Sequence, residues 1–167
     1  MARLRVRMAG RDDIDTLLAL RDAVAVDLLG RGILQWNPGE VTADDLDGWI
    51  QSSSLFAAES DSGLVGSVRV GWSDPDAWGR RPDAAGYVKD LMIGPAERGS
   101  GLGLELLGWA ESYIGRTGRH WIRLDCASSN LRLCRYYTDA GFRRVESKNL
   151  DRALFEKTLE APAARIG

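Results

Sequence analysis

A glycine-rich segment stands directly in front of a strongly apolar helical pattern near the middle of the 167-residue chain. Residues 95–109 read PAERGSGLGLELLGW. Four small residues come first and four apolar residues follow at helical spacing: Gly99, Ser100, Gly101 and Gly103, then Leu104, Leu106, Leu107 and Trp109. Glycines weaken a helix but let another group approach the backbone, and the first N–H groups of a helix have no internal partner. The segment therefore predicts an anion bound at a helix start.

The rest of the chain alternates strand and helix patterns around a central strand–helix–strand unit. Apolar and polar residues alternate in the strands, and capping residues mark helix starts, as in Thr42 followed by Asp45. We expect strands at 4–8, 55–59, 64–72, 87–93, 120–126, 142–148 and 153–158. We expect helices from 12 to Gly30 or Gly32, at 42–50, at 103–114, and from Asn130 until Gly141 closes the helix as its C′ residue. Residues 73–84 read as a polar loop. This order predicts a single α/β domain over 3–158, followed by a flexible tail at 159–167.

The bulk composition is that of an ordinary soluble globular protein, with 44% apolar and 28% charged residues. No apolar run reaches the roughly 20 residues that span a bilayer, and the N-terminal MARLRVRMAG is too short and too charged for a signal peptide. We therefore expect a cytoplasmic protein. Cys126 and Cys134 fit that compartment as reduced structural thiols, because a zinc site needs more ligands at closer spacing.

The net charge of −2 argues against two classes of partner. A protein without a basic field has little attraction for nucleic acid or for an anionic membrane surface, so we expect neither as a partner. Nineteen of the 22 basic residues are arginine, a bias that is typical of GC-rich coding and indicates a bacterial source.

Spacing separates the motifs that could bind an anion at the glycine-rich segment. A P-loop requires Lys and then Ser or Thr after its last glycine, whereas Leu104 and Glu105 follow Gly103 here. A dinucleotide fingerprint needs a further glycine at Leu104 and begins at a strand end, whereas five residues separate Ile93, the last residue of the strand, from Gly99. Asp125 nevertheless lies where a ribose-binding acid is found, so a nicotinamide-dependent oxidoreductase stays open as a weaker alternative.

A third pattern, R-x-x-G-x-G, is present at Arg98, Gly101 and Gly103, behind a strand that ends in an apolar residue and a proline. A second segment, NLRLCRYYTDAGFRRV, places Tyr137 seven residues after Asn130 and a Gly-Phe pair four residues after Tyr137. Both segments, together with the order of elements from end to end, resemble the GNAT superfamily of acetyl-CoA-dependent N-acetyltransferases.

The resemblance implies a fold and a reaction. The fold is the α/β GNAT fold, a mixed central sheet of about six to seven strands flanked by about four helices, with a splayed central strand pair. The reaction is transfer of the acetyl group of acetyl-CoA, a co-substrate, by direct attack of an amine in a ternary complex without a metal. The sequence departs from the family's commonest residues at Thr138, Asp139 and Ala140, where Glu, Lys and Leu are usual, and the chemistry requires none of these positions.

The resemblance also assigns residues to the donor. In the family, backbone N–H groups around the glycines hold the CoA pyrophosphate, and the matching residues here are Arg98, Gly99, Ser100, Gly101, Leu102, Gly103 and Leu104. Free backbone groups of the splayed strand pair with the pantetheine arm and the acetyl carbonyl, a role that falls on Leu91, Met92 and Ile93. Asn130 also holds the pantetheine arm, with a helix cap as the alternative role.

Three residues are candidates for the catalytic proton transfers. Tyr137 matches the family's general acid, which protonates the departing sulfur, and a Tyr that only packs and hydrogen-bonds the donor is the alternative. Asp125 is the candidate base, because some relatives that acetylate protein N-termini carry a catalytic Glu at that strand end. Asp90, on the strand beside the carbonyl-binding backbone, is its rival, and a structurally paired carboxylate is the alternative for both. We expect His120 at the surface.

The acceptor site is expected in three loops, and the sequence leaves the acceptor open. Aromatic and acidic side chains that suit a cationic amine are Trp36, Glu40, Asp74, Asp76 and Trp78. Arg80 and Arg81 would instead favour an acceptor that bears a carboxylate. Small-molecule amines and protein N-termini both stay open, as does a homodimer, since dimers are common in the family. A CoA-binding regulatory module without turnover is the alternative to an enzyme.

Overall fold

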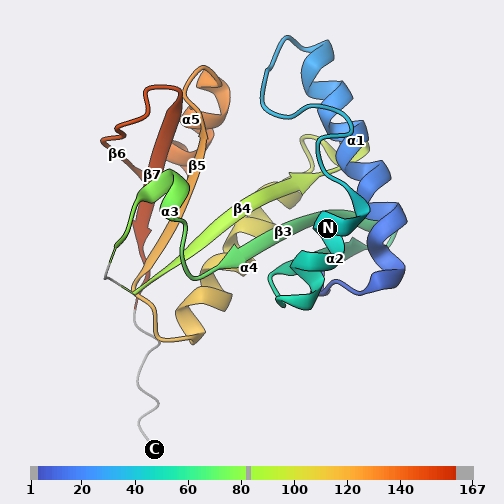
Figure 1. The fold of residues 1–167 in the computed structure, drawn as a ribbon, viewed down its shortest axis with the longest axis horizontal. Helices are drawn as coiled ribbons and strands as arrows, with labels where there is room; N and C mark the ends of the chain where they lie inside the picture. Colours follow the sequence, from blue (N-terminus) through green and yellow to red (C-terminus); the bar gives the residue numbers. More distant parts are fainter. Residues whose placement is uncertain (1–3, 82–83, 161–167) are drawn as a thin grey trace, which may run out of the picture. The chain divides into compact units, whose positions relative to one another are not determined.

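The computed structural model describes residues 4–81 and 84–160 (Figure 1). Seven strands among these residues form one mixed sheet in the order β1-β2-β3-β4-β5-β7-β6. The strands are β1 (Arg5–Met8), β2 (Leu55–Ser60), β3 (Gly63–Gly71), β4 (Ala85–Ile93), β5 (Trp121–Ala127), β6 (Arg143–Val145) and β7 (Arg152–Thr158). The helices are α1 (Ile14–Gly30), α2 (Ala43–Gln51), α3 (Pro75–Trp78), α4 (Leu102–Arg116) and α5 (Leu131–Asp139), with 3-10 turns η1 (Arg11–Asp13) and η2 (Pro95–Glu97). The predicted α/β fold class is confirmed.

The chain packs into two compact units. The first contains the described residues up to Val70 together with Lys89–Leu107, and the second contains Gly71–Val88 with the described residues from Gly108 onward. A single domain over 3–158 stays a prediction. Of the expected tail at 159–167, residues 161–167 lie outside the described part, whereas the N–H of Leu159 still donates to the carbonyl of His120 at 2.7 Å. No helix in the described part of the chain is long and apolar enough to cross a membrane.

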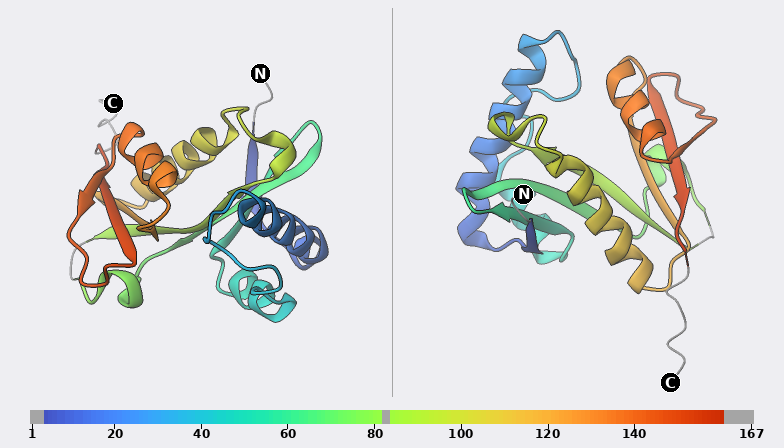
Figure 2. Two further views of the ribbon diagram at one scale, coloured as in Figure 1. Left: turned by 90° about the horizontal axis from the view of Figure 1, so that it is seen from above. Right: turned by 180° about the vertical axis from the view of Figure 1, so that it is seen from behind.

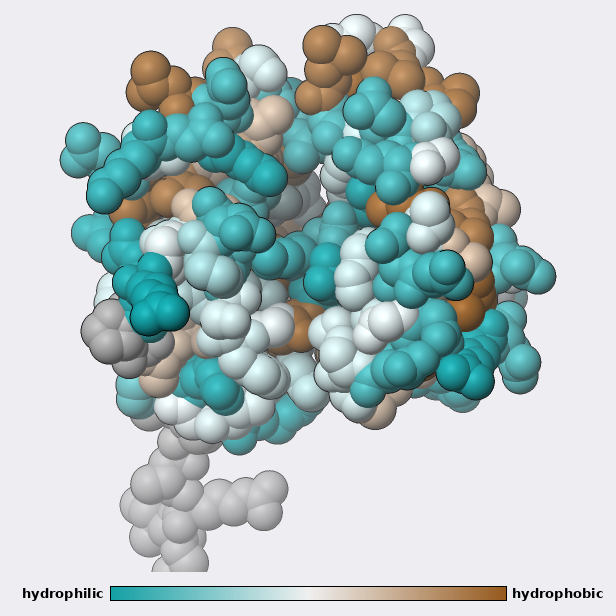
Figure 3. Space-filling model, viewed as in Figure 1, coloured by the Kyte–Doolittle hydropathy of each residue, from teal (hydrophilic) through white to brown (hydrophobic). Residues whose placement is uncertain are grey.

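In the first unit, α1 and α2 cover one face of the antiparallel strands β1, β2 and β3 (Figure 2). The predicted capping box starts α2, since the Asp45 N–H donates to the Thr42 hydroxyl at 3.2 Å and the Thr42 N–H donates to the Asp45 carboxylate at 2.8 Å. The buried core consists of Ala9, Leu17, Val24, Leu46, Leu55, Ala57 and Met92. The C-terminal part of α1 and the loop after it form an exposed apolar surface that includes Val26 and Leu34 (Figure 3). Thus α1 is apolar on more than the face that it buries.

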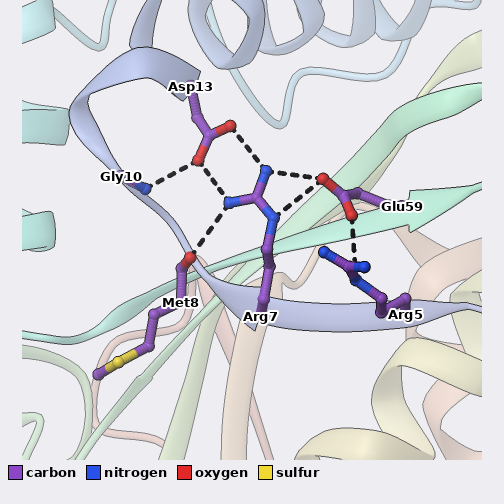
Figure 4. A network of polar contacts seen from close by, with 6 residues as sticks. All are labelled: Arg5, Arg7, Met8, Gly10, Asp13 and Glu59. Atoms are coloured by element: carbon purple, nitrogen blue, oxygen red, sulfur yellow. Dashed lines mark hydrogen bonds and ion pairs between the residues drawn. The ribbon is translucent and has the colours of Figure 1, made fainter.

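Arg7 of β1 is the centre of an ion-pair network (Figure 4). Its guanidinium donates to the Asp13 carboxylate at 2.8 and 2.9 Å and to one Glu59 oxygen at 2.7 and 2.9 Å. Asp13 also accepts from the Gly10 N–H at 2.8 Å. The alternation expected along β1 is therefore imperfect: Arg7 is partly buried between two carboxylates, whereas Met8 is 53% exposed. The network joins β1, η1 and β2.

We expect this network to make the protein sensitive to acid. Hydrogen bonding by Arg7 lowers the pKa of the Asp13 carboxyl below its ordinary value of 3.8. A lowered acid pKa adds stability above the unfolded-state value, and this stability is lost as the pH falls and the folded carboxyl is protonated. Asp13→Asn should therefore lower the free energy of unfolding by about 1–2 kcal/mol near neutral pH, and by much less near pH ~2.

Urea unfolding at the two pH values measures this difference. Asp15→Asn is the control, because Asp15 is an exposed carboxylate in the next helical turn, and its effect should not depend on pH in this way. A loss of stability in Asp13→Asn that is equally large at both pH values would contradict the expected role of the ion pair.

In the second unit, β5 lies between one parallel and one antiparallel neighbour. The start of β5 pairs in parallel with the start of β4. The whole of β5 pairs antiparallel with β7. The parallel register joins Ala85, Gly86 and Tyr87 to Trp121, Ile122 and Arg123. A Cβ atom at Gly86 would lie 2.5 Å from the Ile114 side chain, so α4 packs directly on the backbone of β4.

The polar loop expected at 73–84 contains a helix. α3 starts after Asp74, whose carboxylate accepts from the Ala77 N–H at 3.3 Å. Its Trp78 is buried, and the Arg123 guanidinium lies 5.1 Å from the Trp78 ring. Arg123 is charged and alternates with apolar residues along β5, yet its side chain is 2% exposed. The prediction of an irregular loop is wrong because four residues are too few to give a periodic signal, and the helix that they form covers Arg123.

Candidate functional site

The glycine loop in front of α4 has the backbone of an anion-binding turn. Gly99 has φ 78° and Gly101 has φ 84°, in the left-handed region that glycine adopts without a steric penalty. After the helix begins at Leu102, the N–H groups of Gly103 and Leu104 find no partner among the described residues. The loop thus presents unpaired donors at the positive end of a 15-residue helix.

Contacts within the first unit hold this loop in place. The Ser100 hydroxyl donates to the Glu97 carbonyl at 2.5 Å and accepts from the Leu102 N–H at 3.4 Å. Leu102 itself is buried, which fixes the first residue of α4. Arg98 forms an ion pair with Asp27 of α1, so its side chain anchors the loop to that helix.

The last residues of β4 follow Asp90, a residue inside the strand with a left-handed backbone conformation. Asp90 has φ 49°, and its two carboxylate oxygens accept from Arg21 and Arg69 at 2.9 Å each. Residues 91–93, which follow it, are buried or partly buried. A proton taken from an amine would have to compete with two guanidinium groups for the Asp90 oxygens, which weakens Asp90 as a candidate base.

In the second unit, Tyr137 of α5 is buried among aromatic rings. The centroids of Phe142 and Phe155 lie 5.9 and 5.7 Å from its own. Burial raises the pKa of the Tyr137 hydroxyl, and the neighbouring Cys126 adds to the rise, so the hydroxyl is protonated at neutral pH. This hydroxyl has no hydrogen-bond partner among the residues that the structure describes. No described residue therefore accepts the Tyr137 hydroxyl proton.

Two further candidates lie at the end of β5 and the start of α5. Asp125 forms an ion pair with Arg152 of β7, and its charge is close enough to Tyr137 to contribute to the raised pKa of that hydroxyl. Asn130 caps α5, since its side-chain oxygen accepts from the Leu133 N–H at 3.1 Å. The capping role that the sequence left as an alternative is thus present, and contact of Asn130 with a pantetheine arm stays a prediction.

The two cysteines are buried free thiols, as predicted. The Sγ atoms of Cys126 and Cys134 lie 3.7 Å apart. Burial raises the pKa of Cys126 to about 12, so this thiol is protonated and is a poor nucleophile. In the described part of the chain, no group of three or more His, Cys, Asp or Glu side chains could hold a metal ion.

A model of the acetyltransferase (GNAT) family matches residues 24–142, well over half of the chain. The chain belongs to the GNAT acetyltransferase family. The predicted resemblance is confirmed, and the protein is an acetyltransferase of this family. The matched residues include the glycine loop, Asp90, Asp125, Asn130 and Tyr137.

Relatives of this GNAT protein match nearly its whole length. The uncharacterized N-acetyltransferase YesJ of Bacillus subtilis is 27% identical over 158 residues, which cover 90% of this chain and 87% of YesJ. A GNAT acetyltransferase of Listeria monocytogenes has a TM-score of 0.82 at 26% identity and covers 93% of this chain and 95% of its own. The PaiA N-acetyltransferase of Thermoplasma acidophilum, solved in complex with coenzyme A, has a TM-score of 0.73 at 21% identity, over 93% and 98% of the two chains. Because the identity is this low, the likeness to PaiA is evidence only that the two proteins share a fold.

Two of the residues expected at the acceptor site of this GNAT protein are buried, and a third already has a cationic neighbour. Trp78 and Asp74 are 5% and 4% exposed, and Asp74 caps α3. The Arg21 guanidinium lies 3.8 Å from the centroid of the Trp36 ring, and Glu40 lies 3.7 Å from the same guanidinium. The indole expected to face a cationic acceptor therefore already has a cation on its ring.

Three residues around β4 of this GNAT protein were not predicted as part of the site. Arg21 and Arg69 bind Asp90, and the Arg69 guanidinium lies 3.9 Å from the Trp49 ring centroid. These residues come from α1, β3 and α2, so no local motif joins them. One signal was available: Arg21 follows Leu17 by four positions, which places a charged side chain on the apolar face of α1.

Proposed function

We propose that the protein is an N-acetyltransferase that transfers the acetyl group of acetyl-CoA to an amine acceptor by direct attack in a ternary complex. The observation that carries this proposal is Tyr137, a buried acid whose hydroxyl has no partner among the described residues. Family membership and the coenzyme A bound to PaiA support the donor. The acceptor is a small amine or a protein N-terminus. The cytoplasm of a bacterium is the proposed location, because it supplies acetyl-CoA.

The proposed donor site uses backbone groups of the first unit. The unpaired N–H groups of Gly103 and Leu104 donate to the CoA pyrophosphate, as is typical of anions at helix N-termini. The backbone of residues 91–93 pairs with the pantetheine arm, and an N–H of this segment polarises the acetyl carbonyl. A donor aimed at the developing oxyanion stabilises the transition state by about 3–4 kcal/mol. Asn130, in the second unit, is proposed to contact the same arm.

In the proposed reaction, the amine nitrogen attacks the carbonyl carbon, and the carbon–sulfur bond breaks as the tetrahedral intermediate collapses. A base removes one proton from the amine, and Tyr137 donates one to the sulfur. The pKa of a thiol is about 8.5 and that of a phenol about 10, and burial raises the pKa of Tyr137 further. Tyr137 therefore assists through its position and by staying protonated, and not through acid strength. Its proton is then restored from the base.

Asp125 is the proposed base, acting through a water molecule. Its ion pair with Arg152 orients the carboxylate, and its charge contributes to the raised pKa of Tyr137. This arrangement lets the base return a proton to the acid after each turnover. Asp90 is the weaker candidate, because both of its oxygens accept from guanidinium groups.

Incubation with acetyl-CoA and a panel of amines tests the proposal. We expect the free thiol of CoA and the acetylated amine to appear in equal amounts with at least one acceptor. Tight CoA binding without acceptor-dependent thiol release would favour the regulatory CoA-binding module instead. Binding of NAD in place of CoA in a competition experiment would favour the oxidoreductase.

Gly101→Val should weaken CoA binding by about tenfold or more, which corresponds to about 1.4 kcal/mol. Gly101 has φ 84°, and a β-branched residue at that angle would move the loop and its N–H groups. Isothermal titration with CoA measures the change. Gly118→Val is a matched control, because Gly118 has φ 83° and lies in the turn after α4, with space for a Cβ atom at both glycines. If the two variants bind CoA equally well, the pyrophosphate assignment is wrong.

A further inference from the structure

Asp90 has a backbone conformation that is uncommon for a residue other than glycine inside a strand. Its φ of 49° lies in the left-handed region, although it is inside β4. Residues other than glycine adopt this region at an energetic penalty, and Asp and Asn tolerate it better than most. Such residues persist only where surrounding contacts hold them, and they gather at functional sites.

Two arginines hold the Asp90 carboxylate, one at each oxygen. Arg21 Nη1 donates to Oδ1 and Arg69 Nη1 donates to Oδ2, both at 2.9 Å. Each guanidinium also lies over an indole ring, Arg21 at 3.8 Å from the centroid of Trp36 and Arg69 at 3.9 Å from that of Trp49. A planar guanidinium between a carboxylate and an aromatic face has little freedom to move. We call Asp90, Arg21 and Arg69 the β4 clamp.

The β4 clamp has few competing contacts. The Nε atoms of Arg21 and Arg69 are buried and have no hydrogen-bond partner among the described residues. Arg21 is 6% exposed, and its other acidic neighbour, Glu40, lies at 3.7 Å, beyond hydrogen-bond distance. Asp90 is therefore the main polar partner of both guanidinium groups, and the two pairs restrain one side chain from two directions.

The backbone that follows Asp90 is held a second time, at its far end. A Cβ atom at Gly66 of β3 would lie 2.4 Å from the Met92 carbonyl oxygen, so only glycine allows β3 to approach β4 so closely. The Gly94 N–H donates to the Val65 carbonyl at 2.8 Å. Residues 91–93 thus lie between the β4 clamp and the hydrogen bond of Gly94, and Met92 itself packs on Gly66. These contacts together restrict the direction of their N–H groups.

We propose that the β4 clamp is a positioning device for acetyl transfer. Asp90, held by Arg21 and Arg69, turns the backbone so that an N–H of residues 91–93 meets the acetyl carbonyl oxygen. This inference rests on the proposed function, and it gives Asp90 a role other than that of a base. A hydrogen-bond donor stabilises an oxyanion only when it is already oriented toward it, and small displacements of such groups reduce turnover strongly.

Substitutions in the β4 clamp test this role. Asp90→Asn keeps the size of the side chain and its tolerance of the left-handed region but removes the charge. We expect Asp90→Asn, Arg21→Gln and Arg69→Gln each to lower kcat by about ten- to a hundredfold. The Kd for CoA should change much less than kcat, because the glycine loop proposed to hold the pyrophosphate lies outside the β4 clamp and only the pantetheine contacts of residues 91–93 depend on it. The double variant Asp90→Asn with Arg21→Gln should be little worse than either single variant, since all three residues act through one contact set.

Amide hydrogen exchange supplies a readout that does not depend on turnover. The N–H groups of Leu91 and Met92 should exchange faster in each variant than in the wild-type protein. Arg69→Lys keeps the charge but not the planar group, and it should recover part of the kcat lost in Arg69→Gln. Arg11→Gln, which breaks an exposed pair with Asp47 in the same unit, is the matched control and should keep the wild-type kcat.

The outcomes are distinguishable. A wild-type protein that acetylates no amine overturns the proposed function. An active wild-type protein whose Arg21→Gln and Arg69→Gln variants keep full kcat while Asp90→Asn loses it overturns the β4 clamp, because Asp90 then acts as the base. Unchanged amide exchange at Leu91 and Met92 also overturns it. Urea unfolding of each variant confirms that kcat is compared between folded proteins.

Discussion

Tyr137→Phe lowers kcat by about 10²- to 10⁴-fold, the range that a positioned general acid contributes. The substitution removes one hydroxyl that has no partner among the described residues, so no internal hydrogen bond is lost. The ring keeps its contacts with Phe142 and Phe155. The free energy of unfolding and the Kd for CoA should therefore stay close to their wild-type values. Steady-state thiol release measures kcat, and calorimetry measures the Kd.

Tyr136→Phe is the matched control for this prediction. Tyr136 is the preceding residue of α5, its ring centroid lies 5.7 Å from that of Tyr137, and burial raises its pKa as well. It should keep the wild-type kcat, because only Tyr137 matches the acid of the family. An unchanged kcat in Tyr137→Phe would remove it from the mechanism and leave a packing role. A large fall in both variants would point to damage to α5 instead.

Arg123→Met destabilises the protein by about 3–5 kcal/mol, the effect expected when one partner of a buried ion pair is removed. Arg123 is 2% exposed, and its Nε donates to Glu156 at 3.2 Å while Nη1 donates to the Tyr87 hydroxyl at 3.1 Å. Without Arg123, the buried Glu156 keeps only Arg143, whose side chain is 73% exposed, as a described charged partner. For a domain of this size, the loss corresponds to roughly 10 °C in Tm.

Two further variants show whether the lost stability comes from leaving a buried carboxylate unpaired or from losing the packing of the Arg123 side chain. Arg123→Met combined with Glu156→Met removes both charges and should recover most of the lost stability, because no unpaired carboxylate stays buried. Arg143→Met should lower the free energy of unfolding by less than about 1 kcal/mol, since an exposed pair contributes little. Urea unfolding compares the three. An Arg123→Met variant that is as stable as Arg143→Met would show that the buried pair contributes little.

Local signals were sufficient for most of the secondary structure. The capping box of Thr42 and Asp45 starts α2, and Gly141, with φ 92°, follows α5 as predicted. These features depend on residues within a few positions of one another. α3 was not predicted because Pro75–Trp78 is little more than one helical turn, too short for a repeating amphipathic pattern. Its existence also explains the buried Arg123, whose environment depends on a segment far away in the sequence.

The candidate site likewise contains residues that local motifs predict and residues that only the tertiary structure identifies. The glycine loop and Tyr137 were predicted because each lies in a motif of fixed spacing on a single helix or turn. The left-handed Asp90 and its two arginines were not, because the partners come from α1, β3 and β4. Asp90 resembles an ordinary polar strand residue in the sequence, and nothing within a few positions of it indicates its left-handed conformation.

The sequence by itself therefore determined the order of the strands and of the longer helices, the glycine loop and Tyr137 as the candidate acid, because backbone conformation and helical spacing are local properties. Only the tertiary structure decided which charged groups pair with one another. Whether a carboxylate such as Asp90 is a base or a support depends on which cations reach it. Those cations lie on strands and helices that are separate in the sequence and that only the tertiary fold brings together.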